Sequence, residues 1–294
     1  MKQLLVIVLR SSAVFMLCYG AFAQAVLLPQ SDVKPGTASA NVQVLQPFTI
    51  EGLARERQVR LYLPPGYRHS QKRYPVLYLH DGQNVFDDAT AYAGEWGVDE
   101  TLNALAAQGW LELIVVAIDN GGPYRMTEYS GWDNPRFGKG EGSYYIDFVS
   151  KVVKPFIDKH YRTLSQPQHT GIMGSSMGGL ISHYALFNRP GIFALAGIFS
   201  PSYWYAQAVF LQTDISVLPP GSRISMLMGG KEGRQMVTNL QKMAALLQKQ
   251  GLNSTQLAVK VVADGEHNEA FWRSEFADSA LYLFNPAAFY LRRH

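Results

Sequence analysis

The sequence predicts an α/β fold, a three-layer sandwich in which helices cover both faces of a mostly parallel central sheet. Along most of the 294 residues, short apolar runs rich in β-branched side chains alternate with longer segments of helical periodicity, as expected of strands joined by helical crossovers. The first two runs are separated by only a few residues, which predicts an N-terminal antiparallel hairpin before the parallel strands begin. No internal repeat or change of composition marks a second folded domain.

The expected elements follow these runs in chain order. Strands are predicted at residues 42–51, 58–63, 76–79, 113–118, 169–174, 194–199, 223–228 and 257–262. Helices are predicted at residues 97–107, 144–159, 177–188, 235–250 and 269–284. From residue 76 onward the alternation is regular, and this part of the chain is expected to supply the parallel strands.

A secretory signal peptide is predicted at residues 1–23. Lys2 is followed by two short apolar runs and by the small-x-small site Ala21-Phe22-Ala23, the usual layout of such a segment. A membrane anchor is the alternative, but neither run reaches the roughly 20 residues needed to span a bilayer. We therefore expect cleavage after Ala23 and a periplasmic or secreted protein, with a linker at residues 24–41 and one folded domain at residues 42–294.

Composition excludes several classes of protein for the mature chain. The only cysteine, Cys18, lies in the signal peptide, so disulfides and thiolate chemistry are not expected. Loss of Lys2 and Arg10 lowers the formal charge from +3 to +1, which gives no reason to expect nucleic acid or a membrane surface as partner. The 271 residues left of 294 suffice for one domain with a sizeable core.

The motif Gly174-Ser175-Ser176-Met177-Gly178-Gly179 carries the strongest chemical signal. A G-x-S-x-G segment between a strand and a helix is typical of a nucleophile elbow, in which glycines two residues before and after the serine let strand and helix approach closely. Chance could supply the bare pattern, and Ser175 is the rival nucleophile. The strand before it, the helix after it and the extra Gly179 favour Ser176 as nucleophile.

A serine hydroxyl needs a base, which in this chain order follows the serine. The histidines after Ser176 are His183, His267 and His294. His183 lies in the helix that begins at the elbow, and His294 is the terminal residue. His267 follows the strand at 257–262, and we expect it to be the base.

An acid usually orients that base and stabilises its cation. Between Ser176 and His267 the carboxylates are Asp214, Glu232, Asp264 and Glu266. Glu232 directly follows the strand at 223–228 and should lie at the carboxyl edge of the sheet, so it is our candidate. The alternative is a helix N-terminal acid that interacts with the helix dipole.

The tetrahedral oxyanion also needs donors. We expect these to be the backbone N–H of Met177, which follows the nucleophile, and that of Gln83, in the loop after the third strand. His80 and Asp81 in the same loop region are too few ligands for a metal site, and no metal or other cofactor is expected.

Two loop regions at the same edge should shape the pocket. Residues 119–122, with 124–129 and Trp132 beyond them, follow one strand, and residues 202–205 follow another. Asp119, Trp132, Tyr203 and Trp204 are the candidate substrate-binding residues, because aromatic and polar groups together suit a sugar or a phenolic acyl group. The alternative is that the aromatic residues only cap the core.

Three blocks together resemble the Putative esterase family of α/β-hydrolases: YLHDGQNVF at 78–86, GSSMGG at 174–179 and GEHN at 265–268. That family is similar to esterase D, to feruloyl and acetyl-xylan esterases, to siderophore esterases and to mycolyltransferases. The resemblance runs from about Thr49 to Leu283, and it implies the α/β-hydrolase fold with Ser176 as nucleophile and His267 as base. Glu232 replaces the more usual aspartate, and some similar siderophore esterases use serine and histidine alone, so the third member stays open.

We therefore expect an exported serine esterase that hydrolyses a small-molecule carboxylic ester through an acyl-enzyme. An acyl-sugar, a feruloyl ester or a siderophore ester would suit it. One alternative is an acyltransferase on the same fold, in which an acceptor alcohol outcompetes water. The other is an exported binding protein that kept the fold and lost the chemistry.

Overall fold

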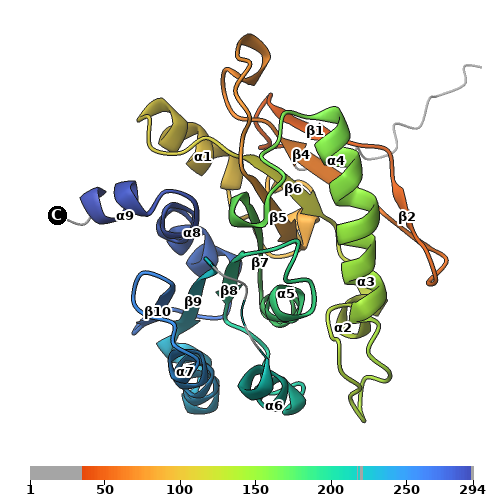
Figure 1. The fold of residues 1–294 in the computed structure, drawn as a ribbon. Coiled ribbons are helices and arrows are strands. Elements are labelled where there is room, and N and C mark those ends of the chain that lie inside the picture. The colour runs from red at the N-terminus through yellow and green to blue at the C-terminus, as the bar shows by residue number, and fades with distance from the viewer. Residues whose placement is uncertain (1–34, 217, 219–220, 293–294) are drawn as a thin grey trace, which may run out of the picture. The chain divides into compact units, whose positions relative to one another are not determined.

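A central eight-stranded sheet organises the protein, whose computed structural model describes residues 35–216, 218 and 221–292 (Figure 1). In spatial order its strands are β1 (Val42–Val44), β4 (Val59–Tyr62), β6 (Ile114–Ile118), β5 (Val76–His80), β7 (Thr170–Ser175), β8 (Leu195–Phe199), β9 (Arg223–Gly229) and β10 (Leu257–Val262). The strands from β6 to β10 pair in parallel, whereas β1, β4 and β6 pair antiparallel. The sheet is therefore mostly parallel, as predicted.

The predicted strand at 42–51 is two strands in the structure. β1 joins the main sheet, and β2 (Phe48–Ile50) pairs antiparallel with β3 (Arg55–Arg57) as a separate ribbon. Pro47 stands between them, and proline lacks the N–H that a continuous ladder would need. The antiparallel hairpin is present, but it is interrupted.

Helices cover both faces of the sheet (Figure 1). In the described residues they are α1 (Val98–Ala107), α2 (Arg125–Glu128), α3 (Gly142–Phe148), α4 (Lys154–His160), α5 (Met177–Asn188), α6 (Ala208–Ile215), α7 (Arg234–Lys249), α8 (Glu269–Phe284) and α9 (Pro286–Arg292). On β5, Val76 and Tyr78 point into a core shared with α3, α5 and α7, while Leu77 and Leu79 point into a core shared with α1, α8 and α9. Alternate strand residues thus fill two separate cores, which confirms the three-layer sandwich.

The predicted helix at 144–159 contains an irregular segment. A π-helical stretch, Val149–Val153, lies between α3 and α4. Pro155 lies at the start of α4, and a proline inside a helix removes one backbone hydrogen bond, which such a bulge accommodates. The short helices α2, α6 and α9 were not predicted.

The N-terminal part of the described chain lies against the folded body. The backbone N–H of Thr37 donates to Asp87 Oδ1 at 3.1 Å, and that of Ser39 donates to Asp99 Oδ2 at 2.7 Å. The last residues of the predicted linker at 24–41 are thus in contact with the body. The predicted signal peptide at 1–23 lies outside the described residues.

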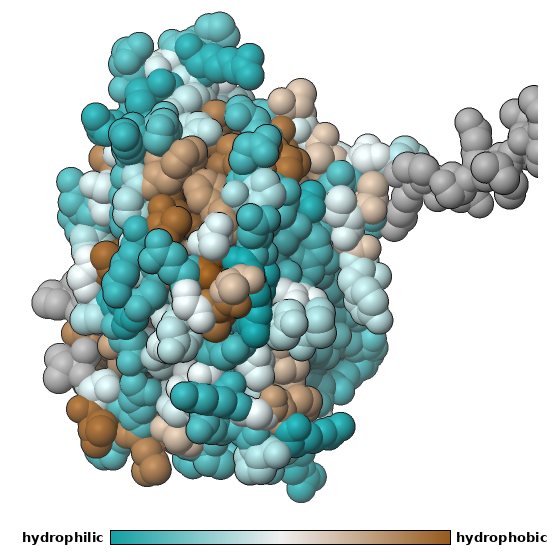
Figure 2. Space-filling view, turned by 90° about the vertical axis from the view of Figure 1, so that its right-hand side faces the viewer, coloured by the Kyte–Doolittle hydropathy of each residue, from teal (hydrophilic) through white to brown (hydrophobic). Residues whose placement is uncertain are grey.

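The face over α3 and α4 is largely hydrophilic, with apolar residues in a few groups (Figure 2). Across the residues that the structure describes, no helix combines the length and apolar character required to cross a membrane.

Candidate active site

A cavity of about 570 Å³ opens where several parallel strands end. Its lining comes from the segments that follow β5, β6, β7 and β10. The lining residues are Asp81, Gln83, Asn84, Tyr92, Ala93, Trp96, Asn120, Gly122, Arg125, Ser175, Ser176, His267, Glu269 and Trp272. Ligands of α/β proteins bind at this edge of the sheet, and the predicted nucleophile and the predicted base both lie there.

Ser176 sits in a sharp turn between β7 and α5. Its backbone is left-handed, with φ 59° and ψ −120°, a conformation that costs a non-glycine residue energy and is common at functional sites. A Cβ atom on Gly174 would lie 2.9 Å from the backbone of Gly178, and one on Gly179 would lie 2.8 Å from the Phe199 carbonyl oxygen. The glycines are therefore required by close backbone contact, as the elbow interpretation predicts.

The Ser176 hydroxyl is held by another serine. Ser176 Oγ lies 3.2 Å from Ser202 Oγ, and the Ser202 N–H donates to the Ser176 carbonyl at 3.0 Å. Within the described residues, no direct hydrogen bond joins Ser176 to the His267 ring. Catalytic hydrogen bonds are often long before substrate binds, and both side chains line the same cavity.

His267 and Glu232 form a close pair. His267 Nδ1 lies 2.6 Å from Glu232 Oε2, and the Glu232 side chain is 1% exposed. A carboxylate only accepts hydrogen bonds, so Nδ1 carries the proton and Nε2 is left as the acceptor. This is the tautomer that a general base for a serine requires.

The Glu232 carboxylate has three donors. Oε1 accepts from Ser200 Oγ at 2.5 Å and from the Gly229 N–H at 2.8 Å, while Oε2 accepts from His267. Burial raises the pKa of Glu232, but these hydrogen bonds outweigh burial and hold the pKa below its ordinary value. The group is therefore a carboxylate at neutral pH.

The other downstream carboxylates lie elsewhere. Asp214 pairs with Lys249 at 2.9 Å on the surface. Asp264 and Glu266 lie beside Lys231 at 3.5 and 3.7 Å, with side chains 91% and 60% exposed. None of the three is bonded to the His267 ring among the described contacts.

His183 is a core residue. Its Nδ1 lies 3.1 Å from the Tyr203 hydroxyl and its Nε2 lies 2.8 Å from Thr213 Oγ1. Burial lowers the pKa of His183 to about 3, so the ring stays neutral. His294 lies outside the described residues.

The two expected oxyanion donors lie in the first turns of helical segments. Met177 is the first residue of α5, and Gln83 is in the short 3-10 helix Gly82–Asn84. N–H groups in a first turn have no carbonyl partner within their own helix. The Gln83 side chain accepts a hydrogen bond from the Asn120 N–H at 3.1 Å, which fixes this loop against the next one.

Two of the four predicted substrate-binding residues, Asp119 and Trp132, are not among the residues that line the cavity. Asp119 accepts two hydrogen bonds from Arg60, at 2.8 and 2.9 Å. Trp132 packs edge-on against Tyr184, with ring centroids 5.3 Å apart. Both side chains are thus engaged in other contacts, and their role in substrate binding stays a prediction.

Tyr203 and Trp204 are likewise not among the lining residues. Tyr203 is fully buried, and its hydroxyl lies beside His183. Trp204 is 46% exposed and packs edge-on against Phe137, at 6.4 Å between ring centroids. The predicted loops therefore border the site, but these aromatic side chains serve the core and the surface.

Other residues of the predicted loops do line the cavity. Asp81 accepts from Arg125 at 2.6 and 2.9 Å and from Asn120 Nδ2 at 2.6 Å. Burial raises the pKa of Asp81, but Arg125 and Asn120 outweigh burial and lower it. Polar residues just after a strand are the signal that could have identified this network.

A second part of the cavity is aromatic and acidic, and no sequence pattern pointed to it. Trp96 and Trp272 are each 5% exposed, with ring centroids 5.9 Å apart. Glu269 lies 3.4 Å from Asn84, and burial raises the pKa of Glu269. These groups come from segments far apart in sequence.

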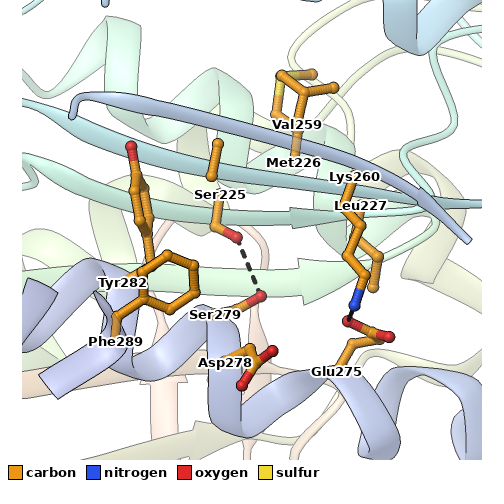
Figure 3. Close-up of a pocket in the computed structure, with 11 residues that line it drawn as sticks. Ser225, Met226, Leu227, Val259, Lys260, Glu275, Asp278, Ser279, Tyr282 and Phe289 are labelled. Atoms are coloured by element: carbon orange, nitrogen blue, oxygen red, sulfur yellow. Dashed lines mark hydrogen bonds and ion pairs between the residues drawn. The ribbon is translucent and has the colours of Figure 1, made fainter. Parts of the chain in front are cut away.

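A smaller cavity of about 130 Å³ lies between β9, β10 and α8 (Figure 3). Ser225 Oγ donates to Ser279 Oγ at 3.0 Å, and Lys260 pairs with Glu275 at 2.6 Å. These four polar groups are thus paired with one another.

Comparison with known proteins places the chain among esterases. Residues 50–283 match the model of the family described as Putative esterase. An uncharacterised protein YbbA of Bacillus subtilis is 28% identical over 248 residues, which cover 80% of this chain and 95% of the relative. An endo-1,4-beta-xylanase/feruloyl esterase of Xylanibacter ruminicola is 26% identical over 157 residues, 52% of this chain and 20% of that protein.

Among solved structures, an enterochelin esterase of Shigella flexneri is similar with a TM-score of 0.69 at 19% identity. The match covers 86% of this chain and 60% of that chain. At such identity the likeness shows a shared fold, which confirms the α/β-hydrolase prediction.

Proposed function

Because this chain belongs to the Putative esterase family, and is therefore an ester hydrolase, we propose that it cleaves carboxylic esters through an acyl-enzyme on Ser176. Glu232 and His267 complete a serine, histidine and glutamate triad. The main support for the proposal is the bond of 2.6 Å between His267 Nδ1 and Glu232 Oε2. His267 and Ser176 line the same cavity. Only Nε2 is then left to accept the serine proton.

The first half-reaction forms the acyl-enzyme. The Ser176 hydroxyl turns from Ser202 toward His267 Nε2, which takes its proton as Oγ attacks the ester carbonyl carbon. The backbone N–H groups of Met177 and Gln83 hold the oxyanion, and Glu232 stabilises the imidazolium. When the intermediate collapses, the ester C–O bond breaks and His267 gives the proton to the leaving alcohol.

The second half-reaction regenerates the enzyme. His267 takes a proton from water, which attacks the acyl carbonyl; collapse then releases the carboxylic acid and returns the proton to Ser176. No metal or other cofactor enters either step. The cavity of about 570 Å³ has the size of a small-molecule site.

The substrate class and the location are proposed from the names of similar proteins and from the N-terminal sequence. Relatives named feruloyl esterase and enterochelin esterase favour an ester of a phenolic acyl group, a sugar or a siderophore. The predicted signal peptide at 1–23 favours hydrolysis in the periplasm or outside the cell.

The proposal is tested by replacing the nucleophile. Ser176→Ala should lower p-nitrophenyl acetate hydrolysis roughly 10³-fold or more, while Ser175→Ala, which removes the rival hydroxyl, should keep most of it. Circular dichroism and thermal melts establish that both variants are folded. A folded Ser176→Ala variant with substantial activity would overturn the proposal.

A further inference from the structure

Ser200 occupies an unusual position beside the proposed triad. It follows β8 directly, is fully buried, and has a left-handed backbone with φ 44°. Its N–H donates to the Leu227 carbonyl at 2.7 Å. Glycine would adopt this conformation without steric cost, so a serine here needs a reason that lies in its side chain.

The Ser200 hydroxyl links Trp272 to Glu232. Trp272 Nε1 lies 2.9 Å from Ser200 Oγ, and Ser200 Oγ lies 2.5 Å from Glu232 Oε1. An indole N–H can only donate, so Ser200 accepts from Trp272. The single hydroxyl proton of Ser200 is therefore donated to the Glu232 carboxylate.

Trp272 also contacts the other member of the pair. Its ring meets the His267 ring edge-on, with centroids 5.0 Å apart and planes at 84°. Trp272 is the fourth residue of α8, whose N-cap, Asn268, accepts from the Phe271 N–H at 2.9 Å. The capped helix start fixes Trp272 relative to the loop that carries His267.

These contacts form a closed circuit: Trp272 to Ser200, Ser200 to Glu232, Glu232 to His267, and His267 back to Trp272. A glutamate has one more rotatable bond than an aspartate and loses more conformational freedom when it is fixed. The circuit supplies that restraint. It holds the Glu232 carboxylate from the side opposite the histidine.

We propose that Ser200 and Trp272 are positioning residues, which hold Glu232 in the orientation that presents His267 to Ser176. This inference rests on the proposed function and goes beyond its triad and oxyanion donors. Ser200 is not among the lining residues of the cavity. It therefore acts on the rate of the chemical step and leaves substrate binding unchanged.

Two variants separate the effect of the Ser200 hydroxyl from the effect of the strained backbone conformation. Ser200→Ala removes the hydroxyl and keeps the strained Cβ, whereas Ser200→Gly removes both. Each should lower kcat roughly tenfold with KM unchanged, and the glycine variant should melt at least as high as the alanine variant. A merely structural hydroxyl would affect the melting temperature and leave kcat alone.

The pH profile gives a second readout. Without the hydrogen bond from the Ser200 hydroxyl, the Glu232 carboxylate keeps more of its negative charge beside His267. That charge favours the protonated form of the His267 ring. The acid limb of kcat/KM, where the base becomes protonated, should therefore move to higher pH by roughly 0.5 unit. The other charged groups near the pair remain in every variant; they are Lys231, Asp264, Glu266, Glu269, Asp81 and Arg125.

Trp272→Phe tests the other link. It keeps a ring against His267 and removes the N–H, so it should lower kcat less than Ser200→Ala does. Ser279→Ala is the matched control, because it removes a buried serine hydroxyl from the same helix, bonded to Ser225 away from the triad. It should keep the kcat and pH profile of the unmodified protein.

The two proposals fail in different ways. An active Ser176→Ala variant would overturn the proposed function and this inference with it. An inactive Ser176→Ala variant, together with folded Ser200→Ala and Ser200→Gly variants of unchanged kcat and pH profile, would overturn the positioning role and leave the proposed function standing.

Discussion

Among single residues, Glu232 decides whether the site is a triad or a dyad. Its carboxylate is buried, carries three hydrogen bonds and has a lowered pKa, caused by those bonds against the effect of burial. An ionised carboxylate held in this way stabilises the imidazolium that forms during acyl transfer. Its position directly after a strand is the feature of the sequence that made it the candidate acid.

Substitutions at Glu232 and His267 should have graded effects. His267→Ala removes the base, and kcat should fall roughly 10³-fold or more. Glu232→Gln keeps the shape and a hydrogen bond but loses the charge, so it should lose less activity. Steady-state kinetics on p-nitrophenyl acetate measure both. Near wild-type activity in Glu232→Gln would indicate that serine and histidine suffice.

Glu269 should make stability depend on pH. Burial, aided by the nearby Asp81 charge, raises the pKa of Glu269 in the folded protein above its value in the unfolded chain, about 4.3. Its stabilising contribution is therefore complete below that pH and is lost as pH rises through the raised pKa. Glu269→Gln should melt higher than the unmodified protein at pH 8 and equally at pH 4. A melting temperature that is lower at pH 8 would contradict this.

The pocket residues show what sequence position can and cannot predict. It places a loop at the carboxyl edge of the sheet, and the loops after β6 do line the cavity through Asn120 and Arg125. It does not say which side chain turns toward the cavity. The Asp119 side chain instead binds Arg60 on β4. These two residues lie far apart in the sequence, so their contact could not be predicted from it.

Among the elements, the turn from β7 to α5 is the one that the sequence predicts most fully. Strand, serine and glycines are local features, and the close contacts at Gly174 and Gly179 give each glycine a reason. Irregular elements were harder to predict. The break at Pro47 and the π segment before Pro155 arise because proline has no backbone N–H. How the surrounding backbone adjusts to the lost hydrogen bond cannot be predicted from local sequence.

The elbow should not tolerate a larger residue at Gly179. A Cβ atom there would lie 2.8 Å from the Phe199 carbonyl oxygen, so α5 and β8 must separate. Gly179→Ala should destabilise the protein by about 1–3 kcal/mol and lower kcat, because Ser176 moves with the helix. Gly191→Ala is the control, since nothing lies within 4 Å of a Cβ atom there. Equal denaturant midpoints for the two variants would contradict the packing argument.

At the scale of the whole molecule, the alternation of strands and helices predicted the sandwich and its mostly parallel sheet. That prediction succeeds because alternation and burial on two faces are properties of the chain as a whole. The cavity depends instead on distant loops that meet, and its volume and aromatic wall could not be read from local patterns.

The predicted signal peptide at 1–23 should be removed on export. When the protein is expressed in a bacterial host, it should appear in the periplasm or the medium. Its mass should be that of a chain whose first residue is Gln24. Intact-mass spectrometry of each cell fraction measures this. A full-length mass retained with the membranes would favour the anchor instead.

Covalent labelling tests directly whether Ser176 is an activated nucleophile. A fluorophosphonate reacts only with an activated serine, and peptide mapping by mass spectrometry locates the adduct. We expect stoichiometric modification of Ser176, strongly reduced in His267→Ala. An active protein that is labelled at another residue, or not labelled at all, would contradict it.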